Sequence, residues 1–235
     1  MLPQVVQEYV VLGKKQETQA VATLSLTLVS GEIPPYKAGQ YVTVYFPDSN
    51  TPRGKEYSIS SAPIEKTFTI TVKAIGEYSG RLCAMNYGDT FLGSLPQGSF
   101  YSEHDEINLV MLAAGIGITP FRGIIFDAIQ RKSSKELYLF YSNPTLQENL
   151  FMHEFEMLSK RNRRLHIQRY VTRESLTVPM ALVRHITPQN ILRIIQDSAH
   201  SEFFISGTTS FVREQRANLQ NAGFRPTHIY TEVCS

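Results

Sequence analysis

The stretch "INLVMLAAGIGITPFRGII" occupies residues 107–125 and carries the strongest fold signal in the chain. Its first part, residues 107–115, is a continuous apolar run, which is typical of a strand buried on both faces of a parallel sheet. Gly115 and Gly117 then let the backbone approach a ligand closely, and Pro120 suits the first turn of a helix. A strand, a glycine turn and a helix in this order predict an α/β sheet with a ligand site beyond the carboxyl end of the strand.

The glycine turn departs from the dinucleotide fingerprint G-x-G-x-x-G, because Phe121 and Arg122 follow where a third glycine would be needed. No Asp or Glu ends the next predicted strand, residues 136–142, where a ribose-binding acid would normally lie. The N–H groups of the turn and the positive end of the helix would favour a pyrophosphate. From the residues alone, a nucleotide site and a plain tight turn between strand and helix are both open.

From about residue 105 onward, segments with strand-like and helix-like patterns alternate along the chain. Such alternation predicts right-handed crossovers, a parallel sheet and helices on both of its faces. The expected elements are strand 107–115, helix 119–132, strand 136–142, helix 146–160, strand 164–171, a helix opened by Thr187 and Pro188, strand 202–207, helix 210–223 and strand 227–233.

Upstream, short β-branched and aromatic segments are separated by turn-forming residues. Six such segments predict a small closed barrel: residues 4–12, 20–29, 40–46, 55–61, 68–75 and 89–95. The one expected helix covers residues 79–88, with Ser79 as its N-terminal cap and Gly88 at its end. The predicted fold is therefore a six-stranded antiparallel β-barrel domain, residues 1–102, followed by an α/β parallel-sheet nucleotide-binding domain, residues 103–235.

Composition excludes several classes of protein. With 42% hydrophobic and 19% charged residues, the 235-residue chain is of ordinary globular type, and a net charge of +2 is too small to indicate a nucleic-acid partner. Cys83 and Cys234 are the two cysteines, too few for a disulfide framework or a four-cysteine zinc or iron–sulfur site. The start does not read as a signal peptide, and no apolar run approaches the ~20 residues of a membrane span. A cytoplasmic protein is expected.

Four elements in one order carry a family resemblance. They are the hydroxyl-rich strand at 55–61, "GEYSGRL" at 76–82, "GIGITP" at 115–120 and the ending "SGTTSF…THIYTEV" at 206–233. Together they resemble the ferredoxin–NADP⁺ reductase superfamily, in which a flavin-binding barrel precedes a pyridine-nucleotide domain. The resemblance covers essentially the whole chain. It implies a flavoprotein that passes a hydride from NAD(P)H to bound flavin and electrons onward to an acceptor.

In the barrel, the resemblance aligns the family's R-x-Y-S flavin motif with residues 55–58, "KEYS". Tyr57 would pack on the isoalloxazine or bond the ribityl chain, and Ser58 would hydrogen-bond near flavin N5. Lys55 stands where the family has an arginine for the flavin pyrophosphate, and lysine offers a point charge instead of a bidentate fork. Arg53, expected two residues back on the same strand face, is the candidate for supplying that fork.

The family's second phosphate element falls on the start of the predicted barrel helix, where a helix N-terminus favours an anion. A plain N-terminal cap by Ser79 is the alternative, and both can hold at once. The predicted flavin-binding residues are Arg53, Lys55, Tyr57, Ser58, Ile59, Ser60, Val72, Lys73, Gly76, Tyr78, Ser79 and Gly80.

In the second domain, the resemblance assigns the dinucleotide pyrophosphate to the glycine turn. Thr172 and Arg173 occupy the place of a Ser-Arg pair that binds the 2′-phosphate in NADP-using members; a solvated loop arginine is the alternative. Ser206 stands where many members have a cysteine beside nicotinamide C4, and Glu232 matches a near-terminal active-site glutamate. The predicted nucleotide-binding residues are Gly115, Gly117, Thr119, Pro120, Thr172, Arg173, Gly207 and Thr208, and the predicted catalytic residues are Ser58, Ser206 and Glu232.

The resemblance implies FAD, with FMN as the alternative, and NADPH or NADH as co-substrate. Because the chain lacks iron–sulfur cysteines, the acceptor would be a separate redox partner such as a ferredoxin, a flavodoxin or an oxygenase component. Two other functions stay open. One is a reductase of free flavin or another small acceptor. The other is a non-catalytic module that binds flavin or a nucleotide, which the departures at Lys55 and Ser206 keep in consideration.

Overall fold

The computed structural model describes residues 6–49, 53–173, 182–183 and 185–234. The chain divides into two compact units, each with its own hydrophobic core. Unit 1 consists of Met1–Tyr101 and Arg122–Asp127, and unit 2 consists of Ser102–Phe121 and Ala128–Ser235.

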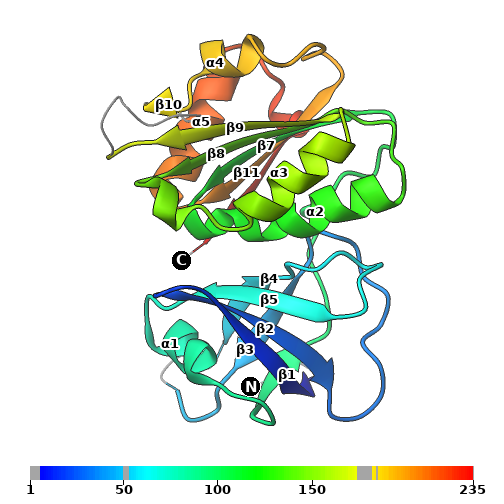
Figure 1. Ribbon diagram of the computed structural model, residues 1–235, viewed down its shortest axis with the longest axis vertical. Coiled ribbons are helices and arrows are strands. Elements are labelled where there is room, and N and C mark those ends of the chain that lie inside the picture. Colours follow the sequence, from blue (N-terminus) through cyan, green and yellow to red (C-terminus); the bar gives the residue numbers. More distant parts are fainter. Residues whose placement is uncertain (1–5, 50–52, 174–181, 184, 235) are drawn as a thin grey trace. The chain divides into compact units, whose positions relative to one another are not determined.

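Unit 1 is built on a six-stranded antiparallel sheet with the order β4-β3-β6-β1-β2-β5 (Figure 1). The two edges of the sheet meet, since Ile59 bridges to Ile70 and the Ser60 N–H donates to the Thr69 carbonyl over 2.8 Å. The predicted antiparallel barrel is thereby confirmed. Its strands are β1 (Val6–Thr18), β2 (Val21–Leu28), β3 (Tyr41–Tyr45), β4 (Lys55–Ser58), β5 (Phe68–Lys73) and β6 (Thr90–Ser94).

Buried apolar side chains alternate with more exposed polar side chains along the strands, and the apolar ones fill the barrel. In β2, Leu24, Leu26 and Leu28 are buried, whereas the intervening polar residues are half-buried. Strand β1 is longer than the predicted segment 4–12, because register shifts interrupt its pairing with β2 and let the strand continue to Thr18.

The barrel helix α1 (Glu77–Ala84) differs from the prediction at both ends. Gly76 is the N-terminal cap, and Ser79 is the third helical residue, whose Oγ accepts from the N–H groups of Ile75 and Gly76 at 3.0 Å each. In a capping box the residue at this position reaches back to the N–H of the cap residue, so a hydroxyl here also marks a helix start, and the prediction of Ser79 as cap was wrong by three residues. Gly88 does not end the helix; it lies in a turn at φ +89°, and its N–H donates to the Val11 carbonyl.

Unit 2 contains a parallel sheet with the order β10-β9-β8-β7-β11-β12, which confirms the predicted α/β architecture (Figure 1). The strands are β7 (Asn108–Ala114), β8 (Leu137–Asn143), β9 (Leu165–Val171), β10 (Leu182–Val183), β11 (Ser201–Gly207) and β12 (Ile229–Val233). The helices are α2 (Thr119–Gln130), α3 (Met152–Arg161), α4 (Pro188–Leu192) and α5 (Thr209–Asn221), with short 3₁₀ turns η1 (Gly115–Ile118), η2 (Leu146–Glu148) and η3 (Pro226–His228).

Helices cover both faces of this sheet. Val110 and Leu112 of β7 belong to one buried cluster with Ile191 of α4 and Leu219 of α5, while α3 lies over the opposite face (Figure 1). A strand covered on both faces must be apolar at every position, which is why residues 109–113 are all buried.

The strand order also fixes where the sheet opens. From β7 the chain proceeds through β8 and β9 in one direction, then returns to place β11 and β12 on the other side of β7. The connections therefore leave β7 and β11 toward opposite faces. The crevice beyond the carboxyl ends of such a strand pair is where open α/β sheets bind ligands.

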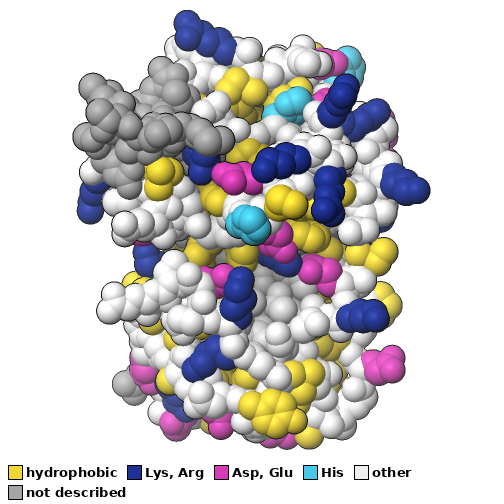
Figure 2. Space-filling view, viewed as in Figure 1, with side chains coloured by type: hydrophobic (Ala, Val, Ile, Leu, Met, Phe, Trp, Pro, Cys, Tyr) yellow, Lys and Arg dark blue, Asp and Glu magenta, His cyan; other side chains and the backbone are white. Residues whose placement is uncertain are grey.

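The helix predicted at 146–160 begins later, at Met152, because Phe151 adopts a left-handed conformation with φ 60°. The helix opened by Thr187 and Pro188 is confirmed, with the Thr187 hydroxyl accepting from the Asn190 N–H, although it covers only five residues. No helix in the described part of the chain has the length and apolarity to cross a membrane. On the face shown in Figure 2, basic and acidic side chains are interspersed.

Candidate functional site

The carboxyl edge of the unit 2 sheet gathers several residues that the sequence singled out. In the register of the parallel strands, Ser206 of β11 lies between Ala113 of β7 and Glu232 of β12. The η1 turn follows β7 directly, and Gly207 ends β11. Two turns and three strands from distant parts of the sequence thus meet at the topological switch point.

Gly117 permits this meeting. A Cβ atom at this position would lie 2.3 Å from the Ser206 carbonyl oxygen and 2.6 Å from the Gly207 nitrogen. Both neighbours are backbone atoms, so only glycine allows the η1 turn to pack directly on the Ser206–Gly207 peptide. Gly115 differs: it has φ +55°, and nothing lies within 4 Å of a Cβ built on it, so this side of the turn is open to a ligand.

Tyr141 of β8 supports the η1 turn. Its hydroxyl donates to the Gly115 carbonyl over 3.0 Å and accepts from the Leu150 N–H over 3.3 Å. Burial raises the pKa of Tyr141 to about 12, so the phenol keeps the proton that it donates. The sequence pattern indicated only a core residue here, and nothing in it revealed this contact.

The two remaining predicted residues, Thr119 and Pro120, have structural places at the start of α2. The Thr119 hydroxyl donates to the Ile116 carbonyl over 2.7 Å, and Pro120 is the second residue of α2. Donation from this hydroxyl to a ligand would therefore compete with an existing bond, whereas its oxygen can still accept. The backbone N–H groups of the turn are its available anion donors.

The next turn along the same edge leads into α5. Thr208 caps this helix, with its hydroxyl accepting from the Phe211 N–H over 3.4 Å. Thr208 and the two residues after it are exposed. A capped helix of this length carries positive potential at its start, directly beside the Ser206–Gly207 peptide.

Thr172 and Arg173 follow β9 at the same edge of the sheet. Their N–H groups donate to the carbonyls of Asn143 and Pro144, over 3.1 Å and 2.9 Å. Both side chains are exposed. The backbone of the pair is thus tied to the loop after β8, while the guanidinium of Arg173 stays accessible to a ligand.

Cys234, which the predicted site does not include, lies against Ser206. Its Sγ is 3.5 Å from the Ser206 Oγ, and its N–H donates to the Gly207 carbonyl over 2.8 Å. Burial, followed by the charge of Glu232, raises the pKa of the Cys234 thiol to about 12. No local sequence pattern pairs these residues; the parallel register of β11 and β12 brings them together.

In unit 1, the predicted flavin residues lie on and around β4. Lys55 is exposed at the start of the strand, and Tyr57 is half-buried against the barrel core, where burial raises the pKa of its phenol. The expectation that Arg53 shares the strand face of Lys55 was wrong, because β4 begins at Lys55 and Gly54 turns the chain with φ +73°. Arg53 is exposed in that turn.

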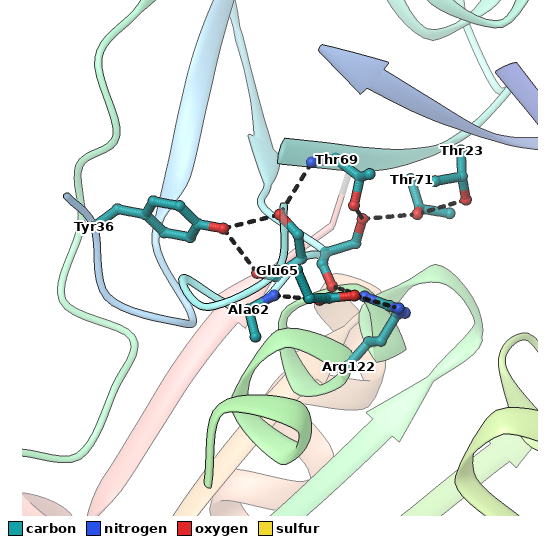
Figure 3. Close-up of polar contacts among 9 residues, drawn as sticks. Thr23, Tyr36, Ala62, Glu65, Thr69, Thr71 and Arg122 are labelled. Carbon is teal, nitrogen blue, oxygen red and sulfur yellow. Dashed lines mark hydrogen bonds and ion pairs between the residues drawn. The ribbon is translucent and has the colours of Figure 1, made fainter. Parts of the chain in front are cut away.

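Ser60 is hydrogen-bonded to Thr69, Thr71 and Arg122, three residues that Figure 3 labels. Its Oγ is 2.7 Å from the Thr69 hydroxyl and accepts from the Thr71 hydroxyl over 3.0 Å, and its carbonyl accepts from Arg122 over 2.8 Å. The Ser60 N–H is used in barrel closure. Each polar group of Ser60 therefore has a protein partner, which gives this residue a structural role. Ile59 and Val72 are buried in the same core, and Lys73 is half-buried.

Arg122, which sequence reasoning treated only as a missing glycine, anchors this network (Figure 3). Its two terminal nitrogens donate to the two carboxylate oxygens of Glu65, over 3.0 Å each. One of those oxygens also accepts from the Ala62 N–H over 2.6 Å. The segment after β4 is thereby fixed by a bidentate ion pair, a strong and directional form of charge-assisted bonding.

The start of α1 forms an open backbone corner. Nothing lies within 4 Å of a Cβ built on Gly76 or Gly80. The Ser79 hydroxyl is used in the turn, as described for the helix cap, and Tyr78 is buried with its hydroxyl 2.6 Å from Ser49 Oγ. An anion at this corner would therefore meet backbone N–H groups rather than side-chain hydroxyls.

Several known proteins are similar to this chain. Residues 111–216 match the family model described as the oxidoreductase NAD-binding domain. The flavohemoprotein of Bacillus subtilis is 24% identical over 232 residues, which are 96% of this chain and 58% of that protein. The glycine betaine monooxygenase reductase subunit of Chromohalobacter salexigens is 27% identical over 227 residues, 92% of this chain and 61% of that protein. The chain thus spans less than two thirds of the length of these relatives.

A solved ferredoxin–NADP⁺ reductase of Neisseria gonorrhoeae, with bound FAD and NADP, has the same fold. The likeness has a TM-score of 0.82 at 24% identity and covers 97% of this chain and 98% of that one. The chain therefore has the fold of a ferredoxin–NADP⁺ reductase, and its residues 111–216 match the oxidoreductase NAD-binding domain. The matched segment contains the η1 turn, Arg173 and Ser206, whereas Glu232 and Cys234 lie after it.

Proposed function

We propose that this chain is a flavin-dependent reductase, with a flavin held by unit 1 and NAD(P)H held at the switch point of unit 2. The observation that carries the proposal is the packing of the η1 turn on the Ser206–Gly207 peptide, with open space at Gly115 and the buried Ser206 hydroxyl beside it. A bound flavin would accept hydride from the nicotinamide and release electrons to an acceptor. The protein supplies position and electrostatics.

On the nucleotide side, the roles follow from position along the sheet edge. The η1 backbone and the start of α5 bind the pyrophosphate, because both present N–H groups at a positive helix end. Ser206 and Glu232, adjacent in the register of β11 and β12, lie at the nicotinamide end. Arg173 takes the 2′-phosphate of NADPH, since its guanidinium is exposed at the same edge.

On the flavin side, the fit rests on the open corner at α1 and the accessible half of β4. Tyr57 is half-buried, so its ring offers one face to the core and another to a ligand. Ser58 follows at the end of the strand and is half-buried. Gly76 and Gly80 leave the space that a side chain would fill, and the basic residues at positions 53 and 55 supply positive charge. FAD is favoured over FMN, in line with the cofactor named for the Neisseria reductase.

The acceptor in this proposal is a separate redox protein. The Chromohalobacter relative is a reductase subunit of a monooxygenase, and the Neisseria relative is a ferredoxin–NADP⁺ reductase. An oxygenase component, a ferredoxin or a flavodoxin is therefore the class of partner to test. The residues proposed for the flavin and the nucleotide are the same whichever of them accepts the electrons.

Replacing Arg53 or Lys55 with alanine should each lower flavin retention. A charge-assisted contact to phosphate contributes about 1.5–3 kcal/mol, so the Kd for FAD should rise about 10- to 100-fold. The measurement is a fluorescence titration of the apoprotein with FAD. Lys66→Ala is the matched control, because Lys66 is an exposed lysine in the same unit outside the proposed site. Loss with only one variant identifies that residue as the anchor, and no loss with either removes both from the site.

Replacing Arg173 with alanine should weaken the use of NADPH while sparing NADH. The 2′-phosphate is the only chemical difference between the two nucleotides, and loss of its arginine contact should raise the KM for NADPH at least about tenfold. Steady-state kinetics with both nucleotides and one artificial electron acceptor measure the ratio. Arg225→Ala is a control at another exposed arginine of unit 2. An equal loss with both nucleotides would remove Arg173 from the 2′-phosphate role.

A further inference from the structure

Cys234 contacts Gly207 through its backbone and Ser206 through its side chain. The N–H to the Gly207 carbonyl measures 2.8 Å, and the thiol sulfur lies 3.5 Å from the Ser206 Oγ. The register of β11 and β12 ends one residue earlier, with Gly207 beside Val233. Cys234 therefore extends the sheet by one hydrogen bond, at the point where Ser206 reaches the switch-point site.

The η1 turn packs on the Ser206–Gly207 peptide from another side. Gly117 packs so closely on the Ser206 carbonyl and the Gly207 nitrogen that no side chain fits between them. The backbone of Ser206 is thus fixed by its neighbours in β7, η1 and β12. What these contacts leave undecided is the direction of the Ser206 hydroxyl, which has three staggered positions.

The sulfur of Cys234 is the partner that can select among those positions. Ser206 is fully buried, so its hydroxyl does not reach bulk water. Within the part of the chain that the structure describes, this hydroxyl lies in hydrogen-bonding distance of the Cys234 sulfur. The thiol is held in its neutral form by burial and by the charge of Glu232, which raise its pKa, and a neutral thiol is both a weak donor and a weak acceptor. Because the thiolate is the nucleophilic form, Cys234 is not suited to covalent chemistry.

We propose that Cys234 is a positioning residue for the nicotinamide end of the site: its thiol holds the buried Ser206 hydroxyl in one rotamer beside the bound nucleotide. The inference rests on the proposed function and deepens it, because it adds a residue that acts through Ser206 without touching the nucleotide. Cys234 should therefore affect the rate of hydride transfer and not the affinity for the nucleotide. Removing it should slow flavin reduction while leaving nucleotide binding almost unchanged.

The kinetic test uses the flavin-loaded protein and measures anaerobic flavin reduction as a function of nucleotide concentration, which separates Kd from the limiting rate. Cys234→Ala removes a hydrogen bond of about 0.5–1.5 kcal/mol, so the limiting rate should fall about 2- to 10-fold while Kd changes less than about twofold. Cys234→Ser, which keeps a partner for the hydroxyl, should restore most of the rate. In a Ser206→Ala background, Cys234→Ala should have no further effect.

A merely structural role for Cys234 predicts a different pattern. Cys234→Ala would then lower the rate by the same factor with and without the Ser206 hydroxyl, and Cys234→Ser would not rescue it. Either result would overturn the inference. Cys83→Ala offers a control for loss of a thiol elsewhere, since the Cys83 sulfur donates to the Val72 carbonyl within unit 1.

A second readout needs no catalysis. The S–H stretching band that disappears in Cys234→Ala belongs to this thiol, and it should shift in Ser206→Ala because its partner is removed. An unshifted band would overturn the contact on which the inference depends. If the band shifts but no nucleotide reduces the flavin of the unmodified protein, the proposed function fails, and the positioning role falls with it. The two failures are therefore distinguishable.

Discussion

Replacing Gly117 with alanine is expected to weaken nucleotide binding strongly. The added methyl would lie 2.3 Å from the carbonyl oxygen of Ser206 and 2.4 Å from its carbonyl carbon, and neither atom belongs to a flexible side chain. This clash can be relieved only if the η1 turn and the end of β11 move apart. Overpacking of this kind costs about 3 kcal/mol, which corresponds to a rise of about 100-fold in the Kd for NAD(P)H.

Isothermal titration with NADP⁺ and NAD⁺ measures this loss, and flavin content shows whether unit 1 is unaffected. Gly223→Ala is the matched control, because Gly223 has φ +94° but nothing lies within 4 Å of an added Cβ. That variant should carry only backbone strain of about 1–2 kcal/mol in stability and bind nucleotide normally. Normal nucleotide binding by Gly117→Ala would contradict the site at the switch point.

Replacing Arg122 with alanine is expected to destabilise unit 1 and to lower its flavin retention. The Arg122 side chain is 14% exposed and that of Glu65 is 27% exposed, so the carboxylate left behind is partly shielded from water. The same change frees the Ser60 carbonyl, two residues after Ser58. Loss of charge-assisted bonds in this setting should cost about 2 kcal/mol in the free energy of unfolding.

Urea unfolding of the apoprotein measures that cost, and a double-mutant cycle with Glu65→Ala isolates the pair, with an expected coupling of about 1–2 kcal/mol. Arg81→Ala is the matched control within the same unit. Arg81 donates to both carboxylate oxygens of Asp48, but this pair is far more exposed, at 38% and 70%. Exposed pairs contribute little, so Arg81→Ala should leave stability nearly unchanged. If Arg122→Ala and Arg81→Ala lowered the free energy of unfolding equally, the difference in burial between the two ion pairs would not matter, and the prediction would be wrong.

Local patterns in the sequence were sufficient to predict the architecture. The unbroken apolar run of β7 required a strand covered on both faces, and the two glycines after it marked the turn at the switch point. The barrel segments were recognisable because their alternation and turn residues are local signals. The helix at α1 was found but misplaced, since a serine near a helix start can be either the cap or the third helical residue that reaches back to the N–H of the cap.

What the sequence could not reveal are contacts between residues distant in the chain. The pairing of Arg122 with Glu65, of Tyr141 with Gly115 and of Cys234 with Ser206 each depends on tertiary register. Arg53 was placed on the wrong face because the extended pattern was assumed to run through Gly54, whose positive φ turns the chain. Which side chains meet at the sheet edge and around β4 could therefore be known only from the fold.

Anaerobic titration of the FAD-loaded protein with NADPH and NADH tests the central claim most directly. The protein should acquire the visible absorbance of a bound flavin, and at least one of the two nucleotides should bleach it before any acceptor is added. Arg173→Ala and Gly117→Ala should slow or abolish the bleaching without removing the flavin. A protein that gains no flavin spectrum with FAD would contradict the account, and so would a flavin-loaded protein that neither nucleotide bleaches.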